Sequence, residues 1–392
     1  MIHFLWSDDN SYPALARCSI PDHERDISDT VPLLAKPVRG SYGALARRIA
    51  AKLGLFVVSI SIFILALILV KEGAKPLAPL IRERFSVDSP ASALGFGWLS
   101  ASMVLSGSPI AATALAFLDA RVLSANETFA MVAGSRLGAS FIVLLVGFVY
   151  VLRGRQREVS LGAGLVSLLV TQSMYIPILA IGFFLLAQPW VQQWQIQAKG
   201  AVHSPLDVVF DPLIAFLTGY LPPWVLFPIG FGLLFFSLWL FDHLLPDLHL
   251  EESRLGQVHH LLYRPVVTFA LGAGITALTM SVSVSLSLLV PLSTRGYIRR
   301  ENIIPYIMGA NITTFDDTLI AAALLANPAA VTVVLVQMVS VTIVSMFILL
   351  AMFRHYERFL NRLVSNIGRR RRNLAMYILL TLGIPFILLI FG

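Results

Sequence analysis

The sequence predicts an all-α polytopic membrane protein with two inverted-topology repeats, each holding a re-entrant helical hairpin and a broken helix, and an extra C-terminal transmembrane helix. Three observations predict this fold class. The composition is strongly apolar, uncharged stretches of bilayer length follow one another along the chain, and one spaced pattern of small residues occurs twice.

Composition places the chain in the membrane class. Hydrophobic residues make up 57% of the 392 residues and charged residues only 13%, whereas about a quarter of the residues of a soluble domain are charged. A soluble fold of this length has no means of burying so much apolar surface. Because lipid offers the backbone no hydrogen-bond partner, spanning segments must be helices or closed barrels. The alternation typical of barrel strands is absent from the sequence, so we predict helices.

The apolar stretches predict where the chain crosses the membrane. A bilayer core of roughly 30 Å is crossed by about 20 helical residues. Stretches that approach or exceed this length are 53–70, 128–152, 161–187, 224–241, 303–326, 331–353 and 374–391. One of them, 303–326, contains the acidic pair Asp316 and Asp317. Two shorter stretches, 90–105 and 109–118, cannot span, and we predict that they form a hairpin that enters the membrane and returns.

A duplicated pattern of small residues recurs at a constant offset in residue number (265 − 90 = 309 − 134 = 175). The first copy consists of Pro90, Gly97, Ser106, Ser108 and Gly134, and the second of Pro265, Gly272, Ser281, Ser283 and Gly309. In both copies a glycine-led polar patch, at 134–140 and at 309–315, interrupts a longer apolar segment. Duplicated and interrupted apolar segments indicate the central site of a membrane transporter.

Basic residues beside the spans predict the orientation, since they remain on the cytoplasmic side. One cluster comprises Arg47, Arg48 and Lys52, a second lies at 153–157 and a third at 354–372. The connection 188–223 has one lysine and no arginine, so we expect it to be external. Because the clusters lie beside spans, they account for the net charge of +7 without a nucleic-acid partner.

The number of crossings tests the duplication. If 53–70 crosses outward and the hairpin returns, then 128–152 and 161–187 complete an odd number of crossings, which inverts the second copy in the membrane. The predicted parts are a polar cytoplasmic tail (1–48), repeat 1 (49–187), an external connection (188–223), repeat 2 (224–362), and a basic segment with the final transmembrane helix (363–392). The C-terminus is then external. The alternative is that both hairpins are ordinary short helices in a bundle without inversion.

Residues outside the apolar stretches offer little chemistry. The tail is polar, carries six acidic residues and shows no apolar core of a signal peptide. It carries the lone cysteine, Cys18, so an intramolecular disulfide is excluded. His259 and His260 lack a second pair of ligands at metal spacing, so we expect no metal site. Glu127 is expected to cap a helix, and Gln172, Ser173 and Gln337 to form hydrogen bonds between helices.

The hairpin tips are candidates for substrate binding. Re-entrant backbone at membrane depth leaves amide and carbonyl groups free to bind ions. In the first tip Ser106, Gly107 and Ser108 fit this role, because Gly107 permits close approach of the backbone. The second tip has alternate serines, among them Ser281, Ser283 and Ser285. The competing interpretation is that these small residues serve only helix packing.

Ionisable residues inside the membrane carry more weight, since a charge there normally faces a partner or a cavity. Arg136 corresponds by the constant offset to Asn311, so the two copies differ chemically. Arg136 could bind a phosphate-like anion as a bidentate fork. Alternatively it neutralises Asp316 or Asp317 and has no role in binding. Both hold if the substrate competes with the carboxylate for the arginine.

Residues 279–325 resemble a known family of membrane transporters. Met280-Ser281-Val282-Ser283, then Val290-Pro291-Leu292 and Met308-Gly309-Ala310-Asn311-Ile312 resemble the sodium-dependent phosphate cotransporter family, which has a duplicated Gln-Ser-Ser-Ser sequence followed by Gly-Ala-Asn-Ile-Gly-Thr-Thr. The first copy is similar through Leu105-Ser106-Gly107-Ser108 and the patch at 134–140. The resemblance covers residues 45–355. Both glutamines of the family are replaced here, by Leu105 and Met280, and the asparagine of the first copy is Arg136.

The resemblance implies an inverted-repeat symporter that holds phosphate and sodium between two hairpins. It implies these substrate-binding residues: Ser106, Ser108, Ser281, Ser283, Asn311, Thr313 and Thr314. Gly107 and Arg136 join them from the analysis of the residues. For the coupling cation, sodium or a proton, we expect Asp316, Asp317, Ser285 and Ser140. Since Arg136 brings a fixed positive charge, it could replace one sodium ion, and coupling would differ from that of the family.

We therefore expect a multi-pass protein of the plasma membrane that transports inorganic phosphate or a related small oxyanion. No enzymatic activity, cofactor or resident metal is expected, and the partners are the anion and membrane lipids, with a homo-oligomer left open. One alternative is an intramembrane enzyme that acts on a phosphorylated lipid. Another is a transport-inactive anion sensor or scaffold.

Overall fold

The computed structural model describes residues 42–84, 87–152, 157–192, 210, 212, 214–217, 219–244, 264–280, 285–286 and 300–392. The chain divides into two compact units, Met1–Arg48 and Ile49–Gly392. All contacts given below lie within the second unit. Ser281 and Ser283, two of the predicted site residues, lie outside the described residues.

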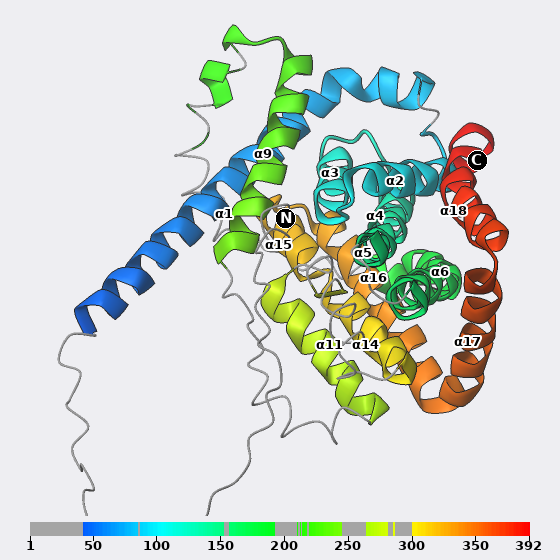
Figure 1. The fold of residues 1–392 in the computed structure, drawn as a ribbon. Helices are drawn as coiled ribbons and strands as arrows, with labels where there is room; N and C mark the ends of the chain where they lie inside the picture. Colours follow the sequence, from blue (N-terminus) through cyan, green and yellow to red (C-terminus); the bar gives the residue numbers. More distant parts are fainter. Residues whose placement is uncertain are drawn as a thin grey trace, which may run out of the picture. The chain divides into compact units, whose positions relative to one another are not determined.

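Every regular element in the described residues is helical (Figure 1). The elements are α1 (Tyr42–Pro79), the π-helical turn η2 (Leu80–Arg84), α2 (Pro90–Val104), α3 (Ser108–Asp119), α4 (Ala125–Ala139), α5 (Phe141–Leu152), α6 (Arg157–Leu186), α7 (Pro189–Gln192), α9 (Pro223–Leu244), α11 (Pro265–Thr279), α14 (Arg300–Thr313), α15 (Asp316–Leu324), α16 (Pro328–Phe347), the π-helical turn η4 (Ile348–Met352), α17 (Phe353–Arg369) and α18 (Arg371–Phe391).

Six segments of the described chain are long and apolar enough to cross a membrane. They are Ala50–Glu83, Ala125–Leu152, Leu161–Leu186, Pro223–Phe241, Pro328–Arg369 and Arg371–Phe391. The predicted stretch 303–326 is not among them, because the chain leaves the helical conformation at Thr314 and Phe315, between α14 and α15. The prediction of an all-α, multi-pass membrane protein is confirmed at this level.

The first helix of each half packs against the other in antiparallel fashion. Ser59 Oγ donates to the Ser237 carbonyl at 2.9 Å, and Ser237 Oγ donates to the Ser59 carbonyl at 3.2 Å. Further along α1, Gly73 faces the backbone of Phe227. Residue numbers therefore rise along α1 as they fall along α9. Both serines are fully buried, so each hydroxyl needs the carbonyl partner that the other helix supplies.

α2 packs against α4, and α11 packs against α14 (Figure 1). The two helix pairs share the same packing register. At four glycines an added β-carbon would overlap a backbone carbonyl oxygen of the partner helix. The contacts are Gly97 with Met131, Gly134 with Leu94, Gly272 with Tyr306 and Gly309 with Phe269. The second two repeat the first two at the same offset in both partners (272 − 97 = 306 − 131 = 175). Glycine is required because only a hydrogen at Cα lets the backbones approach so closely.

The ends of these helices also repeat. α2 and α11 each run for 15 residues and begin with a proline. They end at Leu105 and Met280, which adopt the left-handed conformation with φ of 59° and 46°. The helix after the break begins at Phe141 in the first half and at Asp316 in the second, again at the same offset (316 − 141 = 175). The two positions where the family resemblance has glutamine are thus the left-handed residues that end each hairpin's first helix.

The left-handed conformation of Leu105 predicts how substitutions at this residue affect the stability of the protein. A β-branched side chain is strongly disfavoured at positive φ, so Leu105→Ile is expected to lower the free energy of unfolding by about 1–2 kcal/mol. Leu105→Met is the matched control, because methionine is unbranched at Cβ and occupies the equivalent position in the other half. Thermal or denaturant unfolding in detergent measures both. Equal stability of the two variants would contradict the assigned backbone conformation.

Candidate functional site

Arg136 lies near the end of α4 and is buried, with 4% of its side chain exposed. Its guanidinium reaches across to the second half of the chain. Nη1 donates to Thr314 Oγ1 at 3.0 Å, and Nη2 donates to Thr318 Oγ1 at 2.6 Å. Nη2 also lies 3.4 Å from Asp317 Oδ1, forming a buried ion pair. The guanidinium on α4 is therefore bound by side chains at the break between α14 and α15 in the second half.

The residues around the guanidinium come from the break between α14 and α15. The Phe315 ring lies under the guanidinium, 4.7 Å from Cζ to the ring centroid. Thr318 Oγ1 donates to Asp317 Oδ1 at 2.9 Å, so this threonine links the cation and the anion. Asp317 is in the first turn of α15, where the helix dipole favours a carboxylate. Asp316 is half-buried, and the described ion pairs do not include it.

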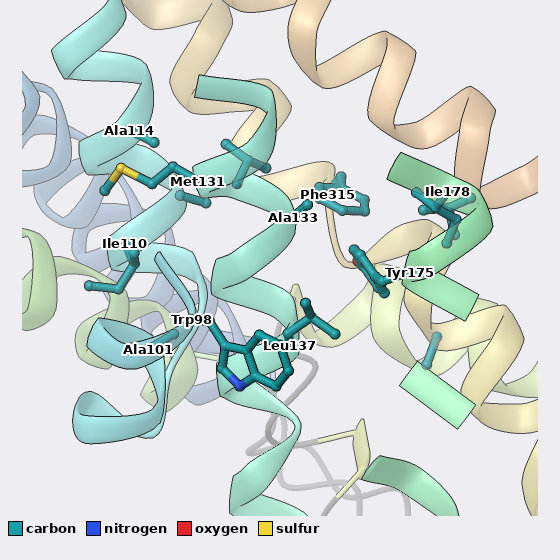
Figure 2. Packing of buried hydrophobic residues seen from close by; sticks show 14 of the residues in the cluster. Trp98, Ala101, Ile110, Ala114, Met131, Ala133, Leu137, Tyr175, Ile178 and Phe315 are labelled. Carbon is teal, nitrogen blue, oxygen red and sulfur yellow. The ribbon is translucent and has the colours of Figure 1, made fainter. Parts of the chain in front are cut away.

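Local sequence explains why Arg136 points toward α15. Gly134 and Gly138 face α2, where their added β-carbons would overlap the carbonyls of Leu94 and Trp98. Arg136 is two residues from each glycine, which is about 200° around a helix. Its side chain therefore leaves the opposite face of α4. Figure 2 shows the same division, with Ile110 and Ala114 of α3 on one side of α4 and Phe315 and Tyr175 on the other.

Several buried polar atoms of the pair and of α14, α6 and α16 have no hydrogen-bond partner among the described residues. On the pair itself they are Arg136 Nε and Asp317 Oδ2, and α14 adds Asn311 Nδ2. Tyr175 of α6 contributes its hydroxyl, and Gln337 of α16 both amide atoms. Buried polar groups are nearly always hydrogen-bonded. These atoms therefore call for water or a ligand.

Tyr175 is at the level of Arg136. α6 runs antiparallel to the segment formed by α4 and α5, because Gly182 of α6 faces the ring of Phe129 and Gly164 faces Leu144. Tyr175 comes seven residues before Gly182, and Arg136 seven residues after Phe129, about two helical turns in each case. The Tyr175 side chain is 1% exposed and lies within electrostatic range of the guanidinium. The unpartnered hydroxyl thus belongs to the surroundings of the ion pair.

The first hairpin tip lies against the same helix. A β-carbon at Gly107 would come 2.9 Å from the Ser135 carbonyl oxygen, so the tip approaches α4 closely. Ser106 and Ser108 on either side are half-buried. Ser108 begins α3, which packs against α4, α15 and α16. The tip and the ion pair therefore share α4 as a neighbour.

Other predicted site residues have partners away from the ion pair. Thr313 Oγ1 donates to the Ala273 carbonyl at 2.8 Å, which ties α14 to α11. Ser140 Oγ donates to the Leu137 carbonyl at 2.6 Å within its own helix. Ser285 bonds to Thr276 at 2.7 Å and to the Tyr306 hydroxyl at 2.9 Å. In the described conformation Thr313 and Ser285 therefore stabilise helix packing, whereas Ser140 bonds back within α4. Of the predicted threonines, Thr314 alone contacts Arg136.

The interhelical role predicted for Gln172 and Ser173 is confirmed. Gln172 accepts from the Tyr377 hydroxyl at 2.7 Å and donates to Thr381 at 3.3 Å, both on α18. Ser173 Oγ lies 2.7 Å from the Tyr356 hydroxyl of α17. Glu127 accepts from the Ser124 amide at 2.7 Å in a capping box, as its position predicted. The prediction was wrong for Gln337, whose amide has no partner among the described residues.

Sequence reasoning missed Phe315, Thr318 and Tyr175. Thr318 directly follows the acidic pair, and a hydroxyl beside an intramembrane carboxylate was the signal that could have found it. Within the described residues, no group of three or more His, Cys, Asp and Glu side chains is placed to hold a metal ion. Comparisons of the chain with protein-family models, with curated proteins and with solved structures find no match.

Proposed function

We propose that this protein is a secondary active transporter of inorganic phosphate or a related small oxyanion, coupled to sodium or protons. The observation that carries the proposal is the buried Arg136–Asp317 pair, which joins the helix breaks of the two halves at 3.4 Å. An intramembrane arginine is costly and normally has a functional partner or cavity. Here the Arg136 Nε and the Asp317 Oδ2 are buried without a hydrogen-bond partner among the described residues.

Inverted repeats are part of the proposal. The recurrence of the glycine contacts at one offset supports a duplicated architecture. The antiparallel packing of α1 on α9 supports inversion, because the corresponding helices of two inverted repeats run in opposite directions. Substrate sites in such transporters lie where discontinuous helices of the two repeats meet. The Arg136–Asp317 pair, which joins α4 to α15, supports such a site in this chain.

The opposite charges of Arg136 and Asp317 offer a physical reason why transport of the anion would be coupled to transport of a cation. An anion that binds Arg136 takes the place of the Asp317 carboxylate, and the displaced carboxylate then needs another cation because an unpaired buried charge is strongly unfavourable. A proton or a sodium ion meets this need. The anion and the cation would therefore enter together. When the anion leaves, Asp317 returns to Arg136 and releases the cation.

The hairpin tip would complete the anion site. The first turn of α3 presents free amide hydrogens and the positive end of the helix dipole, which favour an oxyanion. Ser108 and Gly107 at this end lie against α4, the helix that carries Arg136. The resemblance to the sodium-dependent phosphate cotransporter family favours phosphate over other oxyanions. Arg136 in place of the family's asparagine favours altered coupling.

Uptake into proteoliposomes tests the function. Labelled phosphate is supplied with a sodium gradient, with a proton gradient, or with neither, and protein-free vesicles give the background. We expect saturable uptake that at least one gradient stimulates. Arsenate and sulfate as competitors then measure selectivity among oxyanions. Absence of saturable phosphate uptake under both gradients would overturn the assignment of phosphate.

A further inference from the structure

The most strongly amphipathic described helix is α17, which forms the C-terminal part of the candidate span Pro328–Arg369 and directly precedes the last one, Arg371–Phe391. Its apolar residues, among them Leu360 and Val364, are buried against the protein, and the helix packs on α6 and α18. Its arginines are Arg354, Arg358, Arg362 and Arg369. At 100° per residue these four fall within an arc of about 80° on the side away from Leu360 and Val364. All four are exposed. We call them the arginine stripe.

The stripe continues into a cationic turn at the start of α18. Arg370, Arg371 and Arg372 follow Arg369 directly and are exposed. α18 is the least buried of the candidate spans, with 11% of its apolar window inside the protein. Most of its surface therefore faces lipid. Since a span enters the hydrocarbon near its first apolar residue, the preceding arginines are at headgroup depth. In Figure 1 α17 leads into α18 at the C-terminal end of the chain.

A shallow, open groove lies on the same face of α17 and is lined by Arg358, Asn361, Arg362, Ser365 and Asn366 of this one helix. All five side chains are polar, and four of them carry N–H donors. Such a set suits phosphate oxygens, for which guanidinium groups are the preferred bidentate partners. Phe359 lies beside the groove with 56% of its side chain exposed, which offers an apolar contact next to the donors.

We propose that the arginine stripe and the Arg369–Arg372 turn bind the headgroup phosphate of an acidic glycerophospholipid. Exposed arginines cannot face hydrocarbon without a large cost, so the stripe faces headgroups or water. Acidic lipids concentrate where basic residues adjoin a span. The one acidic residue of α17 is Glu357, so the positive charge of the stripe is offset only in part. Its excess charge is complementary to that of an acidic headgroup, whereas a zwitterionic headgroup offers no net charge.

The test uses the full chain in mixed micelles of detergent and phosphatidylcholine. Phosphatidylglycerol, additional phosphatidylcholine or inorganic phosphate is titrated, and the rise in thermal stability gives the affinity of each. The test variant combines Arg358→Gln, Arg362→Gln and Arg369→Gln. The matched control combines Arg47→Gln, Arg48→Gln and Lys52→Gln, which removes the same charge beside another span. Unchanged stability in phosphatidylcholine alone shows that each variant is folded.

We expect phosphatidylglycerol to stabilise the wild-type protein and phosphatidylcholine to have no effect. The stripe variant should bind phosphatidylglycerol about a hundredfold more weakly, since each of the three arginines near an acidic surface contributes about a factor of five. The control should keep its affinity within about threefold, because none of its three residues lies on α17 or lines the groove. Equal affinity of the stripe variant, or equal stabilisation by both lipids, would overturn the proposal. Stabilisation by inorganic phosphate that disappears in the stripe variant would assign the groove to a soluble anion instead and would also overturn it.

Discussion

Replacing Arg136 with glutamine is expected to abolish anion uptake and to lower the free energy of unfolding by about 3–5 kcal/mol. Uptake is lost because the fixed cation of the proposed site is removed. Stability is lost because Asp317, with 8% of its side chain exposed, remains buried without its cationic partner. Proteoliposome uptake and thermal unfolding in detergent measure the two effects separately.

The partner substitution separates binding from folding. Asp317→Asn in the background of Arg136→Gln removes both charges, and we expect it to recover most of the lost stability, since a neutral pair has no unpaired buried charge. Uptake should not recover, because neither residue then binds an ion. Wild-type uptake in the single or the double variant would show that Arg136 serves only to neutralise Asp317, which would overturn its role in transport.

An exposed ion pair provides the matched control. Lys75 Nζ lies 2.7 Å from Glu72 Oε1, but half of the lysine side chain is exposed. Exposed pairs contribute about 0–1 kcal/mol. Lys75→Gln should therefore leave both stability and uptake close to wild type. A loss as large as that of Arg136→Gln would mean that removing any cation harms this protein, and the Arg136 result would then carry no information on the site.

Gly272→Ala is expected to reduce the free energy of unfolding by about 1–3 kcal/mol or more. The added methyl group would overlap the carbonyl oxygen of Tyr306, and backbone atoms cannot move aside as a flexible side chain does. The strain would separate α11 from α14, which leads into the break that holds Arg136. Uptake should therefore fall as well. Unfolding in detergent and proteoliposome uptake measure the effects.

Gly274→Ala on the same helix is the control. Its added β-carbon meets no atom within 4 Å, and alanine is favoured over glycine in a helix by about 1 kcal/mol. This variant should be as stable as the wild type or slightly more stable. If Gly272→Ala were equally well tolerated, the close approach of α11 and α14 would be wrong, and the shared packing register of the two halves would lose its main support.

The transmembrane helices were predictable because their signal is local. A stretch such as 161–187 must be helical in lipid whatever surrounds it, and α6 occupies Arg157–Leu186. The constant offset between the two copies was also readable, because a glycine that recurs in both copies of an apolar segment indicates a close approach. The sequence did not show which segment approaches each of these glycines. The carbonyls of Met131 and Tyr306 face Gly97 and Gly272 through contacts that no local pattern predicts.

The candidate site was predictable in part for the same reason. Arg136, Asp316 and Asp317 were identified because charges are rare in apolar segments, and this rarity is a property of the sequence. The choice of Asp317 over Asp316 depends on orientation, since adjacent residues on a helix point about 100° apart. Phe315 and Thr318 join the site only because the break between α14 and α15 turns them toward the guanidinium.

Composition and spacing were enough to establish an all-helical membrane protein whose halves share a spaced pattern and in which one half carries an arginine where the other has asparagine. These conclusions depend on the solvent and on helix length, and both can be judged from the sequence. The folded structure was needed to show that Arg136 pairs with Asp317, that Ser285 and Thr313 bond to neighbouring helices, and that the arginine stripe of α17 faces away from the core. These outcomes depend on distances between segments far apart in the chain, and such distances are set by packing.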